Sequence, residues 1–192
     1  MDPTERRELI LTAASRAFAS RPYEEVSLAA IADEAHASEA LVHKYFISKA
    51  GIYAQVLQRA TDELAERTRQ ADEALPPDSS ARDRVRASIL TYLDFIAERS
   101  PGWMAYQILA GHEPGEAAQV RQAARESAVE ALADVVGGGR GHRDDFAFWG
   151  YLGFLDDACL RWVRAGCPAE QRHSLVDAAL GCLEGALGDW RA

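Results

Sequence analysis

The chain has 192 residues, of which 48% are hydrophobic and 27% are charged, and its formal net charge is −9 at pH 7. This apolar content is enough for a packed core and excludes an intrinsically disordered chain. Residues 1–50 are also slightly acidic, with six basic and eight acidic side chains. Composition alone therefore argues against a general nucleic-acid binder.

Helical periodicity dominates the chain, and no run of alternating β-branched residues predicts a strand. Serines before three of the predicted helices, Ser27, Ser38 and Ser48, are typical N-caps. Proline and glycine clusters separate the later helices. In chain order, about nine helices are expected, over residues 4–19, 28–34, 39–45, 49–73, 81–99, 103–110, 116–136, 143–165 and 169–190.

The N-terminus carries no targeting signal that we recognise. Residues 1–26 are charged from the start and contain no long apolar run, which argues against a signal peptide. No stretch approaches the roughly 18 apolar residues of a membrane-spanning helix. We therefore expect a cytoplasmic protein with no membrane partner. The three cysteines, Cys159, Cys167 and Cys182, are expected to be buried thiols, with a redox sensor as the alternative.

The two short helices at 28–34 and 39–45 are joined by only three residues, Ala35 to Ala37. This spacing is typical of a helix-turn-helix, although many helical proteins also contain two short helices and a tight turn. The only two lysines of the chain, Lys44 and Lys49, lie in or just after the second of these helices. Positive charge is thus concentrated beside the predicted motif.

The stretch from Ala17 to Tyr53 resembles the N-terminal domain of TetR-family regulators, and the resemblance covers about residues 5–57. The remaining residues match the family only in their helical layout. The matching positions are Ala17, Phe18, Tyr23, Val26, Ser27, Ile31, Ala32, Ala35, Ser38, Tyr45, Phe46, Ser48 and Lys49.

The resemblance implies an all-α fold with a helix-turn-helix DNA-binding domain at 1–48. It also implies a helical ligand-binding and dimerisation domain at 49–192. The implied function is that of a homodimeric transcriptional regulator. We expect a repressor that a small-molecule effector releases from operator DNA, although activation stays open.

The predicted DNA contacts divide into two groups. Ser27 at a helix N-terminus, Lys49 and the hydroxyl of Tyr45 are suited to backbone phosphates, although Tyr45 could instead be a partly buried core residue. The side chains expected in the major groove are Ser38, Glu39, Ala40, His43 and Lys44. Leu41, Val42 and Phe46 are expected to face the core instead.

Four positions depart from the family pattern. Pro22 and His36 stand where glycine is usual, and His is among the residues that tolerate positive φ. His43 replaces a frequent tyrosine, and Glu39 replaces a basic or neutral residue. Glu39 could accept a hydrogen bond from cytosine N4, or it could be a solvated side chain without a base contact.

The last two predicted helices carry the expected dimer contact. The helix over 143–165 is apolar nearly all round, which is typical of a helix buried on both sides. The last helix contains interior glycines, which favour close helix approach, either between two subunits or within one chain. The expected interface residues are Leu152, Leu155, Cys159, Trp162, Leu180, Gly181, Leu183 and Leu187.

An effector cavity is expected among the fifth to eighth predicted helices. Mostly aromatic side chains with a few polar groups suit a small apolar or aromatic molecule, although each of them could also be a plain core residue. His112 is more typical of a surface histidine. The candidate lining residues are Tyr92, Phe95, Trp103, Tyr106, Gln107 and Trp149.

Two other classes of protein are weighed against this interpretation. An enzyme is disfavoured because Asp144-Asp145 and Asp156-Asp157 are neighbours that point about 100° apart on a helix. The five histidines form no metal-binding pattern, and no phosphate-binding glycine motif is present, so neither metal nor cofactor is expected. A helical interaction module that has lost DNA binding is the second alternative, suggested by the acidic N-terminal region.

Overall fold

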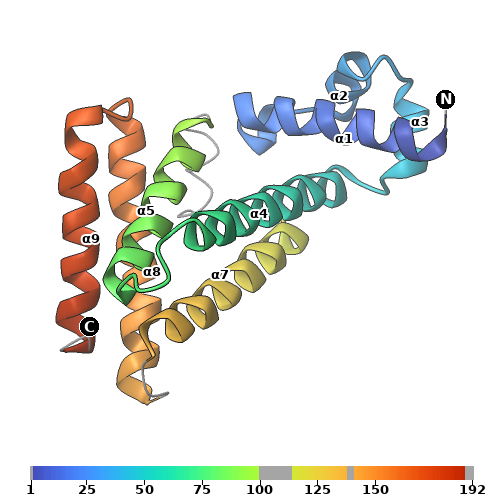
Figure 1. The fold of residues 1–192 in the computed structure, drawn as a ribbon. Coiled ribbons are helices and arrows are strands. Elements are labelled where there is room, and N and C mark those ends of the chain that lie inside the picture. The colour runs from blue at the N-terminus through green and yellow to red at the C-terminus, as the bar shows by residue number, and fades with distance from the viewer. Residues whose placement is uncertain (1, 100–113, 138–140, 189–192) are drawn as a thin grey trace. The chain divides into compact units, whose positions relative to one another are not determined.

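The computed structural model describes residues 2–99, 114–137 and 141–188 (Figure 1). Regular structure in these ranges is helical throughout, with eight α-helices and two short 3-10 helices, which confirms the predicted all-α fold. The expected helix at 103–110 lies outside the described residues. In chain order the elements are α1 (Pro3–Ser20), η1 (Tyr23–Glu25), α2 (Leu28–Glu34), α3 (Glu39–Tyr45), α4 (Lys49–Glu73), α5 (Ala81–Ala97), α7 (Gly115–Val136), α8 (His142–Arg164), η2 (Ala169–Gln171) and α9 (Arg172–Leu187).

The helix boundaries differ from the predicted ones mainly at the last helix. Residues Ala169–Gln171 form a 3-10 turn, in which the N–H of Gln171 donates to the carbonyl of Pro168 at 3.1 Å. The α-helical pattern starts only at Arg172. Periodicity does not distinguish a 3-10 turn from the first turn of an α-helix, so the predicted start at 169 was three residues early.

The chain forms two compact units. Among the described residues, the N-terminal unit comprises 2–62, 99 and 114–122, and the C-terminal unit comprises 63–98, 123–137 and 141–188. Both α4 and α7 contribute residues to each unit. The expected boundary after residue 48 is a functional division and stays a prediction, whereas packing extends the N-terminal unit along α4 to Asp62.

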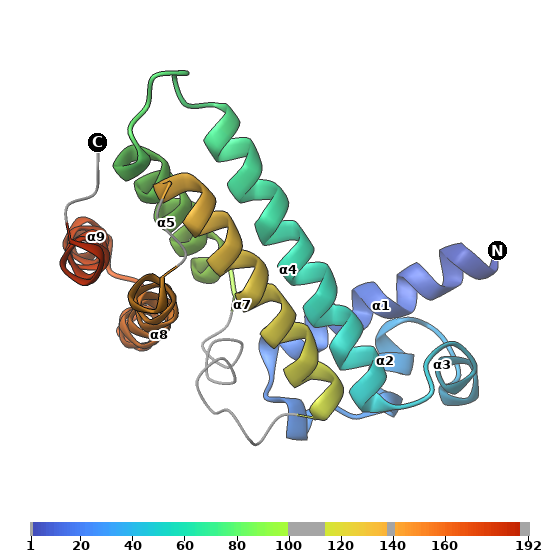
Figure 2. The same ribbon diagram turned by 90° about the horizontal axis from the view of Figure 1, so that it is seen from below.

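The core of the N-terminal unit is built from α1 to α4. In this unit α2 packs on α1 and α3 packs on α2 (Figures 1 and 2). Leu9 of α1 is 46% exposed, because the buried stripe of this helix begins at Ile10. The largest fully buried side chains of the unit are Ile10, Val26, Ile31, Phe46, Ile52 and Leu57.

The C-terminal unit is built around α5, α8 and α9. Helix α9 packs along α8, and α5 packs against both (Figure 2). Val85, Ile89, Leu93 and Ile96 recur at helical spacing on α5 and are buried. At the rim, Arg82 of α5 binds Glu184 of α9 at 2.6 Å, and such exposed ion pairs add at most about 1 kcal/mol each.

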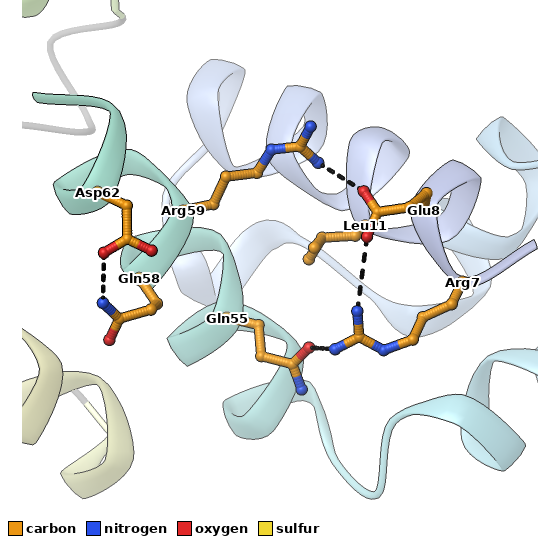
Figure 3. A pocket seen from close by; sticks show the side chains of 7 residues that line it. All are labelled: Arg7, Glu8, Leu11, Gln55, Gln58, Arg59 and Asp62. Atoms are coloured by element: carbon orange, nitrogen blue, oxygen red, sulfur yellow. Dashed lines mark hydrogen bonds and ion pairs between the residues drawn. The ribbon is translucent and has the colours of Figure 1, made fainter. Parts of the chain in front are cut away.

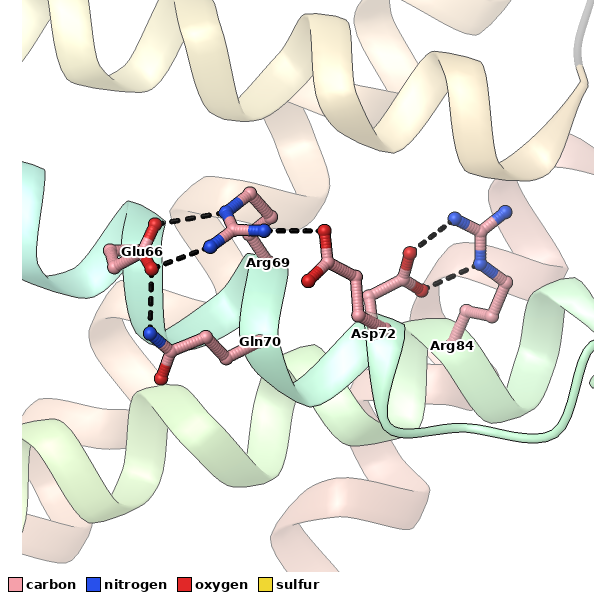
Figure 4. A network of polar contacts seen from close by, with 6 residues as sticks. Glu66, Arg69, Gln70, Asp72 and Arg84 are labelled. Atoms are coloured by element: carbon pink, nitrogen blue, oxygen red, sulfur yellow. Dashed lines mark hydrogen bonds and ion pairs between the residues drawn. The ribbon is translucent and has the colours of Figure 1, made fainter.

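A polar network closes the connection from α4 to α5 (Figure 4). The Arg84 guanidinium donates to both carboxylate oxygens of Asp72, at 2.6 and 2.5 Å. These hydrogen bonds lower the pKa of Asp72. One turn earlier on α4, Arg69 and Gln70 donate to Glu66, which lowers the pKa of that carboxyl to about 2. The Arg84–Asp72 contact therefore joins α4 to α5 across the Pro76-Pro77 turn, while the Glu66 contacts lie within α4.

No helix among the described residues has the length and apolar character needed to cross a membrane.

Candidate DNA-binding site and effector region

The two helices of the predicted motif start where their serine caps predict. The Ser27 side chain accepts a hydrogen bond from the N–H of Ala30 at 3.1 Å, and Ser38 accepts one from Leu41 at 3.2 Å. Each cap satisfies one N–H that a helix start would otherwise leave unpaired. The turn between α2 and α3 contains His36 with φ of +49°, so the expected left-handed conformation without glycine is confirmed.

Helix α3 has a clear inner and outer face. Val42 is fully buried and Phe46, which follows the helix, is 1% exposed, so the two hold the helix on the core. Leu41 and Tyr45 are only partly buried. The residues expected to face DNA all have exposed side chains; they are Ser38, Glu39, Ala40, His43 and Lys44.

Two details of this outer surface were not expected. The Glu39 carboxylate lies 4.0 Å from Nε2 of His43, one turn further along α3, and both side chains are more than half exposed. Ile47, between α3 and α4, is 96% exposed. Sequence reasoning missed Ile47 because an isolated apolar residue in a short turn carries no periodic signal. The ion pair lies on the helix proposed to enter the groove, and Ile47 follows the end of that helix.

Lys49, at the first position of α4, is partly covered by η1. Its ammonium donates to the carbonyl of Glu24 at 3.4 Å and lies 4.2 Å from the ring centroid of Tyr23. Desolvation lowers the pKa of Lys49, and the nearby Glu24 charge partly opposes that change. Lys49 thus has a defined position before any phosphate arrives.

A hollow of about 340 Å³ lies between α1 and α4 in the N-terminal unit (Figure 3). Glu8 of α1 binds Arg59 of α4 at 3.1 Å, and Arg7 donates to Gln55. The polar groups of the hollow thus already bind one another across the two helices. We therefore interpret the polar lining of this hollow as part of the packing contact between α1 and α4.

Two of the aromatic residues proposed for the effector region, Tyr92 and Trp149, contact a partly buried ion pair in the C-terminal unit. Asp156 of α8 binds Arg125 of α7 and accepts a hydrogen bond from the hydroxyl of Tyr92 at 3.3 Å. The Arg125 guanidinium also lies 5.8 Å from the ring of Trp149, and Phe95 is 2% exposed. Arg125 and Asp156 were not foreseen because they come together only through packing. The other candidates, Trp103, Tyr106 and Gln107, lie outside the described residues.

The residues expected at the dimer contact on α8 and α9 differ in how much of their surface is exposed in the single chain. Five of the eight named side chains are already buried within the single chain, with at most 8% of their surface exposed, so they have almost no surface left for a partner. Leu152 and Leu187 are partly exposed and Gly181 is exposed. The five buried residues are Leu155, Cys159, Trp162, Leu180 and Leu183.

A different face of α8 and α9 is open. Phe146 is 76% exposed and Phe154 is 36% exposed. Four exposed glycines lie on the two helices, and a Cβ atom added to any of them would meet no described atom within 4 Å. A tight helix crossing among the described residues therefore does not account for these glycines. They are Gly150, Gly153, Gly181 and Gly185.

The sequence comparisons agree with the geometry of the N-terminal unit. The family described as "Bacterial regulatory proteins, tetR family" matches residues 10–56. The HTH-type transcriptional activator FasR of Mycolicibacterium smegmatis is 32% identical over 171 residues, covering 87% of this chain and 76% of the relative. The match thus extends well beyond the helix-turn-helix.

Solved structures share the fold over nearly the whole chain. A tetR-family transcriptional regulator from Streptomyces coelicolor is 24% identical with a TM-score of 0.83, covering 97% of this chain and 83% of that one. FadR of Bacillus subtilis, solved with stearoyl-CoA, is 17% identical with a TM-score of 0.70, covering 94% and 97%. These structural matches show the fold, and the family match together with the relative at 32% identity identifies the class of protein. The chain belongs to the TetR family of transcriptional regulators.

Proposed function

We propose that the protein binds operator DNA as a homodimer and that a small-molecule effector changes its affinity for that DNA. The observation that carries the proposal is the orientation of α3. Its buried face is held by Val42 and Phe46, while every side chain expected in the major groove is exposed. A recognition helix needs this arrangement, because its outer face must reach base edges while the core fixes its direction.

Phosphate contacts would position α3 in the groove. Ser27 and the N–H groups at the start of α2 suit a phosphate, as do Lys49 and the hydroxyl of the partly exposed Tyr45. Ile47 adds an apolar contact for a deoxyribose or a thymine methyl group. Base recognition would then fall to Glu39 and His43 together with Ser38, Ala40 and Lys44.

The homodimer would use the open face of α8 and α9. Phe146 and Phe154 supply apolar surface, and the glycines let helices of a second copy approach closely. An interior glycine costs about 1 kcal/mol in helix stability relative to alanine, which such a contact can offset. Exposed aromatic residues beside small ones are typical of an interface.

The direction of regulation has two candidates. We propose repression, the usual mode of the family, with release by the effector. The relative FasR is named an activator, which favours activation as the second candidate. In vitro transcription from the protein's own promoter separates them, because a repressor lowers the basal transcript level and an activator raises it.

The effector is proposed to be largely apolar or aromatic and to bind near Tyr92, Phe95 and Trp149. Stearoyl-CoA, which FadR of Bacillus subtilis binds, is a suitable first probe. A true effector must bind the free protein and the DNA complex with different affinities. A molecule that stabilises the free protein but binds the DNA complex equally well is not the effector.

Selection of bound duplexes from a random pool tests the proposed function most directly. We expect an enriched half-site repeated with dyad symmetry, with centres about 34–36 Å apart or somewhat more. Sedimentation of the same preparation should show a dimer at micromolar concentration. A pool without enrichment would overturn operator binding, and a monodisperse monomer would overturn the dimer.

A further inference from the structure

Lys49 is connected to a cluster of three aromatic rings. The ring of Tyr23, beneath the Lys49 ammonium, stacks on Phe18 with centroids 5.9 Å apart and an interplanar angle of 11°. Tyr53 lies 4.8 Å from Phe18 and 4.9 Å from Tyr23. Phe18 and Tyr53 are each 3% exposed, so this cluster has little freedom to move.

The first part of α7 holds the other side of the same cluster. Arg121 donates to the hydroxyl of Tyr53 at 3.3 Å. The Glu116 carboxylate lies near the start of α4, where a Cβ atom on Gly51 would come within 3.6 Å of it. Burial raises the pKa of Tyr23, and the charges of Glu116 and Glu24 raise it further. Helix α7 therefore contacts the group of residues that supports Lys49, within the N-terminal unit.

The contacts of Lys49 leave it able to bind a phosphate. An ammonium group has three N–H donors. One is directed to the Glu24 carbonyl, and the attraction of the charge to the ring face uses no donor in a fixed direction. A lysine already ordered in this way loses less side-chain freedom when it binds, and that gain in affinity is a general effect of preorganisation.

We propose that Tyr23 is a positioning residue for Lys49 and that Arg121 of α7 acts on the same lysine through Tyr53. The proposal rests on the proposed function in one respect only, because the phosphate that Lys49 binds is taken to be that of operator DNA. It connects α7 to the DNA-contacting surface through two aromatic side chains, Tyr53 and Tyr23. The ring contact itself is tested without DNA.

Two lysines in the whole chain make a direct observation possible. Reductive methylation with ¹³C-formaldehyde keeps the charge and labels Lys44, Lys49 and the terminal α-amino group, and Lys44→Arg and Lys49→Arg variants assign the two lysine signals. We expect the Lys49 signal to be shifted upfield of the Lys44 signal by the Tyr23 ring. Tyr23→Phe should keep that shift and Tyr23→Leu should abolish it, while the Lys44 signal stays in place. An unshifted Lys49 signal in the labelled protein without substitutions would overturn the proposal.

The role of α7 is tested in the same spectra. Tyr53→Phe keeps the ring but removes the hydroxyl that Arg121 binds, and Arg121→Met removes the donor. Each should move the Lys49 signal part of the way towards that of Lys44, and the double variant should move it no further than either. Tyr92→Phe, which removes a phenol hydroxyl in the C-terminal unit, is the matched control. If the Arg121 and Tyr53 variants leave the Lys49 signal where the control leaves it, α7 does not act on Lys49 and this half of the proposal is wrong.

A double-mutant cycle on DNA binding tests the consequence. The probe is the duplex enriched by selection. Tyr23→Leu should weaken its binding about three- to tenfold, because Lys49 is then no longer preorganised. Tyr23→Phe, which keeps the ring, should bind as tightly as the original protein. In a Lys49→Ala background, Tyr23→Leu should have no further effect. Equal losses in both backgrounds, with the protein folded by its NMR spectrum, would overturn the positioning role.

The two measurements separate this inference from the proposed function. If no duplex is enriched and none binds, operator binding fails, and the shift of the Lys49 signal still decides the ring contact. If a duplex binds and the cycle is additive, the regulator stands and the positioning role of Tyr23 fails.

Discussion

The α2–α3 motif and the α8–α9 pair differ in how well the amino-acid sequence predicts which side chains are buried and which are exposed. In α3 the apolar residues cluster on one face and the polar ones on the other, so the buried and exposed sides were predicted in the right places. In α8 apolar residues surround the helix, and five of the residues expected to meet a partner are buried within the chain instead. A strong two-sided pattern therefore predicts orientation, whereas an apolar helix does not.

The largest expected effect is on folding, and it comes from a core position of α9. Leu180 is fully buried, so Leu180→Ala should lower the free energy of unfolding by about 2–5 kcal/mol. Leu187→Ala, at a partly exposed position, is the control and should cost clearly less. Chemical denaturation at one fixed protein concentration measures both. A Leu180→Ala variant as stable as the original protein would contradict the assignment of Leu180 to the core.

The neighbouring residue, Gly181, tests the interface. Gly181→Arg should leave a single subunit folded, because a Cβ atom there meets no described atom within 4 Å. It should weaken dimerisation at least about tenfold, which corresponds to about 1.4 kcal/mol. Sedimentation velocity over a concentration series measures the change. Gly115→Arg, at an equally open glycine of α7, is the control, and a dimer that survives Gly181→Arg intact would place the contact elsewhere.

Glu39 tests whether the outer face of α3 reads bases. If its carboxylate accepts a hydrogen bond from cytosine N4, Glu39→Gln should lose about 1–3 kcal/mol of discrimination at one base pair and shift the preference towards adenine. His43 lies 4.0 Å away, so His43→Gln is measured beside it against the same half-site library. Glu39→Ala binding every sequence more tightly would instead identify a solvated, repulsive side chain.

The smallest expected effect concerns pH and the polar network at the end of α4. Because Arg84 lowers the pKa of Asp72, this carboxylate adds stability above its ordinary value near 3.8, and the contribution is lost as the pH falls through the lowered value. Both side chains are about a third exposed, so Asp72→Asn should cost less than about 1 kcal/mol at pH 7. The difference from the original protein should disappear in acid. Denaturation at pH 7 and below pH 3 checks it, and a difference that persists in acid would exclude the charge as its cause.

Long-range contacts account for what sequence reasoning did not predict about the candidate site. Arg121 and Tyr53 are 68 residues apart, and their contact leaves no local pattern in the sequence. The same holds for Arg125 and Asp156. By contrast, the Ser27 and Ser38 caps bind N–H groups only three residues away, so the chain itself specifies them.

Local patterns in the sequence predicted the helical class, the starts of α2 and α3 and the outer face of α3, because caps and amphipathic periodicity act over a few residues. Tertiary packing sets which sides of α8 and α9 are open, since packing against α5 and against each other covers Leu155, Trp162 and Leu180 and leaves Phe146 exposed. It also decided that Tyr23 lies under Lys49, because η1 and α4 meet only in the folded chain. Local hydrogen bonding fixes where a helix begins, while burial, which depends on all the neighbours at once, fixes which residues remain available for binding.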